Sequence, residues 1–192
     1  MTHSLTKLIG GHSDLILGLL AGKKKAIDRA KAVSSAFGFA GNPFESWLAL
    51  RGAASLAIRS ERACETARKL AEKLEGHAAV KAVHYPGLKS HPDHLRAIKM
   101  LCGGFGIIAT IDLGGRPEAD KFIRSLQRIV FAPSLGDAET TLSHPATTSH
   151  RNQSAEQWRT QGITPGLIRL SFGLEDPEDL WADLLQALNQ IS

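Results

Sequence analysis

The sequence lacks the features of several large protein classes. Only 6% of its 192 residues are aromatic, and only two are cysteines. Cys64 and Cys102 have no CxxC spacing, which argues against a disulfide framework and for a reducing compartment. No apolar run reaches the roughly 20 residues of a membrane span, and the first residues show no signal-peptide pattern. We therefore expect a cytoplasmic protein without a membrane partner.

Charge of one sign is not concentrated either. The 23 basic and 19 acidic residues are interspersed, and the only dense basic run is Lys23–Lys25. A nucleic-acid interface needs a larger basic patch with stacking aromatics, so we expect no nucleic-acid partner. The segment His91–His94 has no cysteine beside it, and we predict no metal site. The GxGxxA match at Gly104–Ala109 enters a predicted strand instead of leaving one, which argues against dinucleotide binding.

The hydrophobic pattern predicts strands that alternate with helices. Leu15–Ala21 is a continuous apolar run, typical of a strand that is buried on both faces of a sheet. Helical spacing follows over Lys24–Phe37, and again from Asn42-Pro43 to about Glu75, where Gly52 and its alanine neighbours allow close packing or a bend. So long a helix usually bridges two lobes. We place a domain boundary near Arg59, which gives domains 1–58 and 59–192.

The same alternation continues to the end of the chain. The predicted strands are Val80–Tyr85, Phe105–Leu113, Ile129–Ala132 and Leu167–Phe172. The predicted helices are His91–Leu101, Pro117–Leu126, Ser154–Thr160 and Asp176–Ile191. Residues 134–153 show little regular pattern, and loops of that length are usually functional or disordered. This order indicates a two-layer α/β lobe.

Lys7 is the first candidate for chemistry. A lysine amine attacks an aldehyde only when it is unprotonated. Ser4 and Thr6 lie two positions apart next to it, and both hydroxyls could donate to one phosphate. An amine with such phosphate contacts meets the needs of pyridoxal phosphate (PLP). On spacing alone, an ordinary lysine in a polar terminal loop is the favoured interpretation.

Arg169 is the second candidate, because it stands in an apolar strand where an unpaired guanidinium is costly. Its planar fork suits the carboxylate of a substrate or of an internal acidic residue. The residues alone favour neither. The segment Ser134–Asp137 offers small and hydroxyl groups that could line a ligand, although ordinary turn chemistry is the commoner outcome.

Taken in order, these segments resemble the Cys/Met-metabolism family of PLP-dependent enzymes. That family includes cystathionine γ-synthase, cystathionine β- and γ-lyases, methionine γ-lyase and O-acetylhomoserine sulfhydrylase. The matching segments are Ser4–Lys7, Gly11–Asp14, His84–Leu88, Ser90–Pro92, Gly104–Gly106, Ser134–Gly136, His144–Ala146 and Arg169–Asp176. The resemblance covers essentially the whole chain. It implies an α/β, aspartate-aminotransferase-like fold (PLP fold type I).

Several roles are implied by this resemblance alone. Residues 1–58 would be the end of the PLP-binding large domain with the start of the interdomain helix, and 59–192 the complete small C-terminal domain. Lys7 would be catalytic and bind PLP covalently, with Ser4 and Thr6 on its phosphate. Arg169, helped by Ser134, would bind the α-carboxylate of an amino-acid substrate. The implied reactions are β/γ-elimination or γ-replacement on sulfur amino acids or activated homoserine.

The departures from the family pattern lead to further expectations. Family members are roughly twice as long, and Leu8 replaces a tyrosine that commonly follows the cofactor lysine. We expect a C-terminal portion with little activity alone, whose segment Leu15–Ala21 exposes an apolar edge. Its partners would be copies of itself, a missing N-terminal half or a full-length relative. The alternative function is a non-catalytic interaction or assembly subunit.

Overall fold

The computed structural model describes residues 1–191. The chain divides into two compact units, Met1–Ala57 and a second that begins at Ile58. No helix within the described residues is both long enough and apolar enough to span a membrane.

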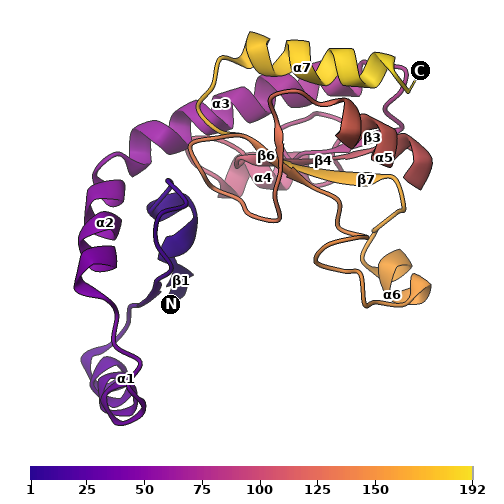
Figure 1. The fold of residues 1–192 in the computed structure, drawn as a ribbon. Coiled ribbons are helices and arrows are strands. Elements are labelled where there is room, and N and C mark those ends of the chain that lie inside the picture. The colour runs from indigo at the N-terminus through magenta and orange to yellow at the C-terminus, as the bar shows by residue number, and fades with distance from the viewer. Residues whose placement is uncertain (192) are drawn as a thin grey trace. The chain divides into compact units, whose positions relative to one another are not determined.

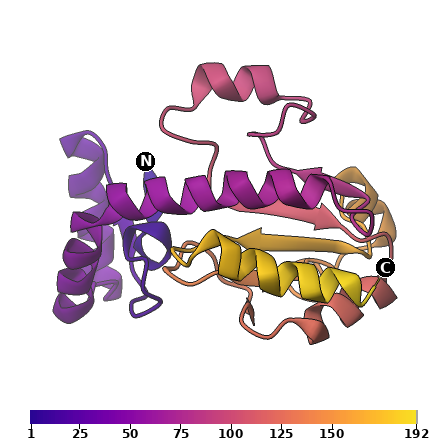
Figure 2. The same ribbon diagram turned by 90° about the horizontal axis from the view of Figure 1, so that it is seen from above.

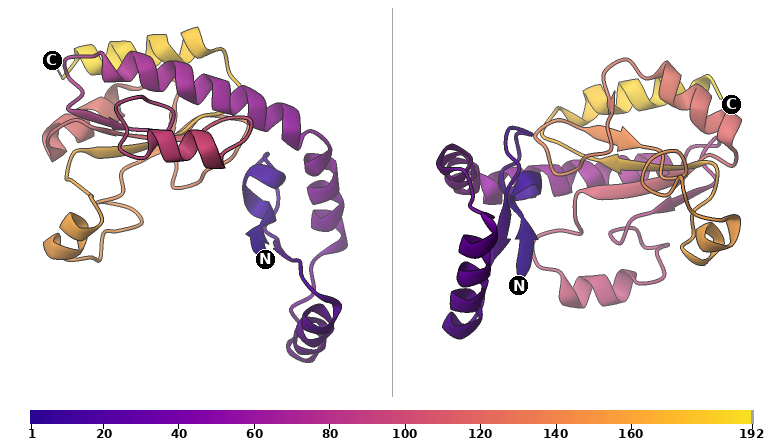
Figure 3. Two further views of the ribbon diagram at one scale, coloured as in Figure 1. Left: turned by 180° about the vertical axis from the view of Figure 1, so that it is seen from behind. Right: turned by 60° about the horizontal axis from the view of Figure 1, so that its bottom comes forward.

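The first unit is a short ribbon with helices. Its elements are β1 (Thr2–Ser4), the π-helical turn η1 (Leu5–Ile9), β2 (Gly18–Leu20), α1 (Lys24–Phe37) and α2 (Pro43–Ala54). β1 pairs antiparallel with β2 (Figure 3). The predicted start of α2 is confirmed, because the Asn42 side chain accepts from the Phe44 amide and Pro43 occupies the first turn.

The strand predicted over Leu15–Ala21 is wrong in its length and in its burial on both faces, whereas the exposed apolar edge expected for this segment is present. β2 has three residues, and all of them are exposed. Leu15 is buried, but Ile16 beside it is 81% exposed. An apolar run forms a doubly buried strand only where neighbouring elements cover both faces. Within residues 1–191, β2 pairs with β1 alone, so its side chains stay uncovered.

The long helix predicted from Asn42 to about Glu75 is two helices. α2 ends at Ala54 and α3 (Leu56–Glu75) follows. Between them, Ser55 has φ −104° and ψ 4°, and its amide and its hydroxyl both donate to the carbonyl oxygen of Gly52. A serine that bonds to local backbone competes with helical hydrogen bonds, which explains the break.

The second unit is a mixed sheet covered by helices. The sheet order is β3 (Ala82–His84), β4 (Ile108–Asp112), β7 (Leu167–Ser171), β6 (Thr141–Ser143) and β5 (Val130–Phe131). Among the described strands of this sheet, only the β5–β6 pair is parallel. The helices are α3, α4 (His94–Met100), α5 (Arg116–Ser125), α6 (Ala155–Thr160) and α7 (Pro177–Asn189). α3 and α7 run side by side over one face (Figures 1 and 2). The α/β prediction is confirmed.

Two local predictions for this unit are wrong. The stretch 134–153 contains strand β6, which pairs with both β5 and β7. Three residues of mixed polarity carry too little periodicity to be recognised. The helix expected from His91 begins at His94, because the preceding residues form a turn closed by the His94 amide on the His91 carbonyl.

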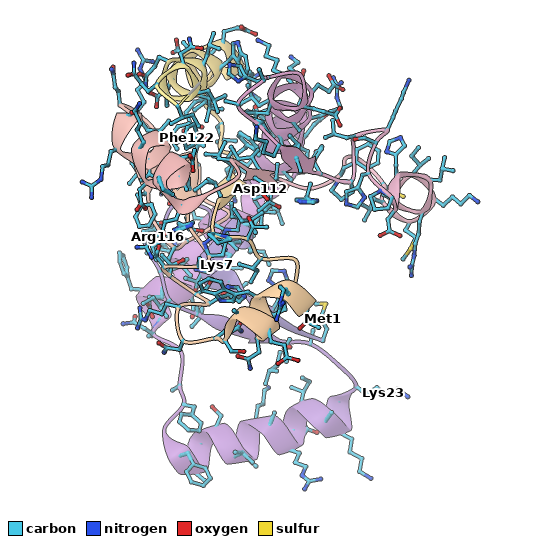
Figure 4. The ribbon with its side chains drawn as sticks, turned by 90° about the vertical axis from the view of Figure 1, so that its right-hand side faces the viewer. Met1, Lys7, Lys23, Asp112, Arg116 and Phe122 are labelled. Atoms are coloured by element: carbon cyan, nitrogen blue, oxygen red, sulfur yellow. The ribbon has the colours of Figure 1, made fainter. Side chains whose placement is uncertain are left out.

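The core of the second unit lies between the sheet and helices α3, α5 and α7. Its fully buried members include Leu70, Leu74, Phe122, Ile168, Leu170, Leu184 and Leu188. Phe122 lies on the side of α5 that faces α7 (Figure 4). Side chains alternate along a strand. Since Ile168 and Leu170 enter this core, the side chains of Arg169 and Ser171 leave β7 on the opposite face.

Candidate functional site

Lys7 lies inside the turn η1 of the first unit, marked in Figure 4. The turn is closed by the Gly10 amide on the Leu5 carbonyl at 2.9 Å and by the Gly11 amide on the Lys7 carbonyl at 2.8 Å. Lys7 itself has φ −95° and ψ −136°, outside the helical region. Downstream, Ser13 has φ 52°, a left-handed conformation that is uncommon for a residue other than glycine. The backbone is therefore tightly specified around the lysine.

Helix α2 touches this turn through a glycine. A Cβ added to Gly52 would lie 2.4 Å from the Gly10 carbonyl oxygen and 2.8 Å from that of Ile9. Real Cβ atoms do not approach backbone oxygens so closely. Gly52 is therefore required for the observed contact between the helix backbone and the lysine turn.

The two hydroxyls near the lysine differ in what they bond. Thr6 Oγ1 accepts from the Leu17 amide at 3.0 Å and so ties η1 to the residue before β2. The exposed Ser4 hydroxyl makes no hydrogen bond within residues 1–191. Both residues line a groove of about 1090 Å³, whose lining does not include Lys7. The two hydroxyls thus share one groove within the first unit.

In the second unit, Arg169 lies on the face of the sheet opposite the helical core. The β7 register places it opposite Thr110 of β4 and Ser143 of β6, so its neighbours in the sheet are neutral. One guanidinium nitrogen, Nη2, donates to the carbonyl oxygen of Ser134 at 2.8 Å. Its Nε is buried and has no hydrogen-bond partner within the described residues.

The charge of Arg169 has no acidic partner. No Asp or Glu within residues 1–191 forms an ion pair with it. Burial lowers the pKa of its guanidinium, and no neighbouring carboxylate opposes that shift. An internal ion pair, one of the two uses considered for this arginine, is therefore not present in the structure.

The turn Ser134–Asp137 meets Arg169 from the loop before β6. The Gly136 amide donates to Oγ of Ser171 at 3.1 Å, and Gly136 has φ 78°, which favours glycine. The next residue, Asp137, acts electrostatically on Arg59 of α3: burial lowers the pKa of Arg59, and the negative charge of Asp137 raises it. Residues of β7 and of α3 thus both interact with this turn.

The predicted site residues therefore fall into two groups. Ser4, Thr6 and Lys7 belong to the first unit, and Ser134 and Arg169 to the second. Sequence reasoning missed the contributions of Arg59 and Ser171. It expected close packing or a bend at Gly52 but did not identify the lysine turn as the neighbour. The alternation of strand residues could have placed Ser171 on the face of Arg169, but no sequence signal pairs it with Gly136.

Comparison with known proteins gives a consistent picture. A family model described as Cys/Met metabolism PLP-dependent enzyme matches residues 1–189. The chain is 44% identical to an L-methionine gamma-lyase of Treponema denticola, with 98% of this chain and 48% of the relative covered. It is 40% identical to a cystathionine gamma-lyase of Bacillus subtilis, over 98% of this chain and 50% of the relative.

Solved structures agree with the relatives. Cystathionine gamma synthase from Xanthomonas oryzae pv. oryzae, in complex with aminoacrylate and cysteine, matches with a TM-score of 0.92 and 38% identity. The match covers 99% of this chain and 49% of that one. The chain thus spans about half the length of the relatives it matches. It belongs to the Cys/Met-metabolism family of PLP-dependent enzymes.

Proposed function

We propose that this chain carries the cofactor lysine and the substrate-binding arginine of a PLP-dependent lyase or transferase. The substrate class is a sulfur amino acid or an activated homoserine, and the reaction is elimination or replacement at its β- or γ-carbon. In this proposal residues 1–58 belong to the large domain and 59–192 form the small domain. A cytoplasmic location is part of it, and both cysteines are free in the structure.

The half-buried guanidinium of Arg169, which has no acidic partner within residues 1–191, is the observation that carries the proposal. A partly desolvated cation without a counter-charge gains from binding an anion. The Nε of Arg169 has no partner within residues 1–191. An α-carboxylate offers two oxygens that match an arginine fork. Every amino-acid substrate carries that group, so the arginine fits the whole substrate class.

The residues of the first unit fit the cofactor chemically. Ser4 and Thr6 line one groove, and hydroxyls of this kind donate to phosphate oxygens. The primary amine of Lys7, which is not among the lining residues of this groove, is the group that can bond an aldehyde carbon. When bound, PLP supplies an electron sink that stabilises negative charge at the substrate Cα. The amine of Lys7 is the group of this chain that would accept and return a proton there.

The test is covalent labelling of the lysine. The purified chain is incubated with PLP at low micromolar concentration, reduced with borohydride and mapped by peptide mass spectrometry. We expect the label to concentrate at Lys7. Lys7→Arg, which keeps the charge and removes the primary amine, should abolish it. Lys25→Ala serves as the matched control, because Lys25 is an exposed lysine of the same unit, and should leave the label unchanged.

A label that spreads evenly over surface lysines would contradict the proposal for Lys7. The arginine is tested separately, by binding of a small carboxylate such as propionate to the chain and to Arg169→Lys. Equal binding to both would contradict the role of Arg169.

A further inference from the structure

The side chain of Ser171 lies beside Arg169 and contacts the same turn. Both residues leave the same face of β7, because they are two positions apart on one strand. Arg169 Nη2 donates to the carbonyl oxygen of Ser134 at 2.8 Å. Ser171 Oγ accepts from the amide of Gly136 at 3.1 Å. Strand β7 therefore holds the Ser134–Gly136 turn at two backbone atoms: Arg169 bonds the Ser134 carbonyl, and Ser171 bonds the Gly136 amide.

The two contacts depend on one another geometrically. The Ser134 carbonyl holds Arg169 only while the turn stays against β7, and Gly136 is the next point along the turn that is fixed to this strand. Ser171 is 2% exposed, so its hydroxyl bonds in a site shielded from water, where losing the bond is expensive. Without it, the turn loses one of its fixed points on β7, and the Ser134 carbonyl, which also accepts from Thr141 Oγ1 at 3.4 Å, is held less firmly against the guanidinium.

We propose that Ser171 is a positioning residue for carboxylate binding. Its hydroxyl holds the Ser134–Gly136 turn so that the Ser134 carbonyl occupies Nη2 and leaves the Nε edge of Arg169 for the substrate carboxylate. This inference rests on the proposed function of Arg169. It adds a residue that does not touch the substrate and acts through the turn.

The structure also provides a matched control. Ser143 is a serine on the neighbouring strand β6, directly opposite Arg169 in the register. It is 3% exposed, against 2% for Ser171. Within residues 1–191 its side chain forms no hydrogen bond. Replacing either serine by alanine removes the same hydroxyl from a similar depth, and only Ser171→Ala releases the turn.

The experiment measures propionate binding to the whole chain by the ¹⁵N signal of the Arg169 Nε–H group. Propionamide, which has the same shape and no charge, is the ligand control. We expect propionate to shift this signal saturably and propionamide to leave it in place. Ser171→Ala should weaken propionate binding about fivefold to tenfold, the effect of losing one buried hydrogen bond. Ser171→Thr should restore binding, and Ser143→Ala should match the wild type.

The outcomes distinguish the positioning role of Ser171 from the carboxylate-binding role of Arg169. If propionate does not shift the wild-type signal, both roles are contradicted. If the wild type binds and Ser171→Ala binds equally well, the positioning role fails and the role of Arg169 stands. Should Ser171→Ala not fold, Gly136→Ala perturbs the same turn from the loop side, since a residue with a Cβ is strained at φ 78°. Wild-type affinity in a folded Gly136→Ala protein would then overturn the inference.

Discussion

Leu70 of α3, in the second unit, is completely buried, whereas Leu50 of α2, in the first unit, is 74% exposed. The same contrast extends to the whole of each unit. The main hydrophobic cluster begins at Ala67 and lies entirely in the second unit. In the first, Phe37, Phe39 and Trp47 are more than half exposed. The second unit is supported by apolar packing, and the first relies on backbone contacts.

This difference bears directly on the site. Arg169, the proposed carboxylate-binding residue, belongs to the unit that has a core, and the candidate lysine Lys7 belongs to the unit with little buried apolar surface. Exposed apolar side chains gathered in one unit are typical of a surface that contacts another protein. We infer that the arginine site is preformed, and that the lysine turn depends on a few close backbone contacts until such a surface is covered.

Leu70→Ala and Leu50→Ala test the contrast at its strongest point. Both change a helical leucine to alanine, one in each unit. Leu70→Ala should lower the free energy of unfolding by about 2–5 kcal/mol, because it removes buried methyl groups and leaves a cavity. Leu50→Ala should change it by less than about 0.5 kcal/mol. Urea unfolding followed by circular dichroism measures both, and equal losses would disprove the contrast.

Asp183 tests a polar support of the second unit. Its carboxylate accepts from the backbone amides of residues 127–129 and so ties α7 to the segment before β5. Asp183→Asn turns a donor toward these amides and should lower the free energy of unfolding by about 2 kcal/mol near neutral pH. Asp179→Asn is the matched control on the same helix. The Asp179 carboxylate forms an exposed ion pair with Arg128, so this change should lower the free energy of unfolding by less than about 1 kcal/mol.

The effect of Asp183 should depend on pH. Burial raises the pKa of this carboxyl, but the hydrogen bonds from the backbone amides and Gln186 together lower it by more. Its pKa therefore lies below the usual value. The stabilisation is therefore present above the pKa of an unfolded Asp, about 4, and is lost as the pH falls through the lower, folded pKa. The stability gap between wild type and Asp183→Asn should narrow in acid. A gap that widened in acid would contradict this account.

Gly52→Ala tests the backbone contact of the first unit and should have a smaller effect on the free energy of unfolding than Leu70→Ala. The added Cβ would overlap the carbonyl oxygens of Ile9 and Gly10, at a cost of about 1–3 kcal/mol, partly offset by the better helix propensity of alanine. Hydrogen exchange at the Gly11 amide should accelerate, and PLP labelling of Lys7 should fall. Gly22→Ala, where nothing lies within 4 Å, should leave both unchanged.

The sequence predicted the second unit better than the first. Strand β7 and helix α7 were recognised because their apolar residues face a core formed within the same unit. The length of β2 and its burial on both faces were predicted wrongly, because an apolar run does not reveal which elements will pack against it. β6 was missed because its pairing with β7 is non-local. The family, recognised from the order of short motifs, was confirmed by the family model.

The candidate site divides in the same way. The residue types at Ser4, Lys7 and Arg169 were enough to nominate them, and their roles remain predictions. Whether Arg169 has an acidic partner could not be decided from the sequence, because that depends on which residues the fold brings beside it. The same is true of the bond between Ser171 and Gly136.

The hydrogen bond between Arg169 and Ser134 uses a main-chain oxygen, which every amino acid at that position would possess. A substitution at residue 134 would therefore change the side chain that the loop presents beside Arg169 and leave this main-chain hydrogen bond in place. The orientation of the guanidinium is thus insensitive to the identity of residue 134, so this loop can vary in its side chains while the arginine keeps its position.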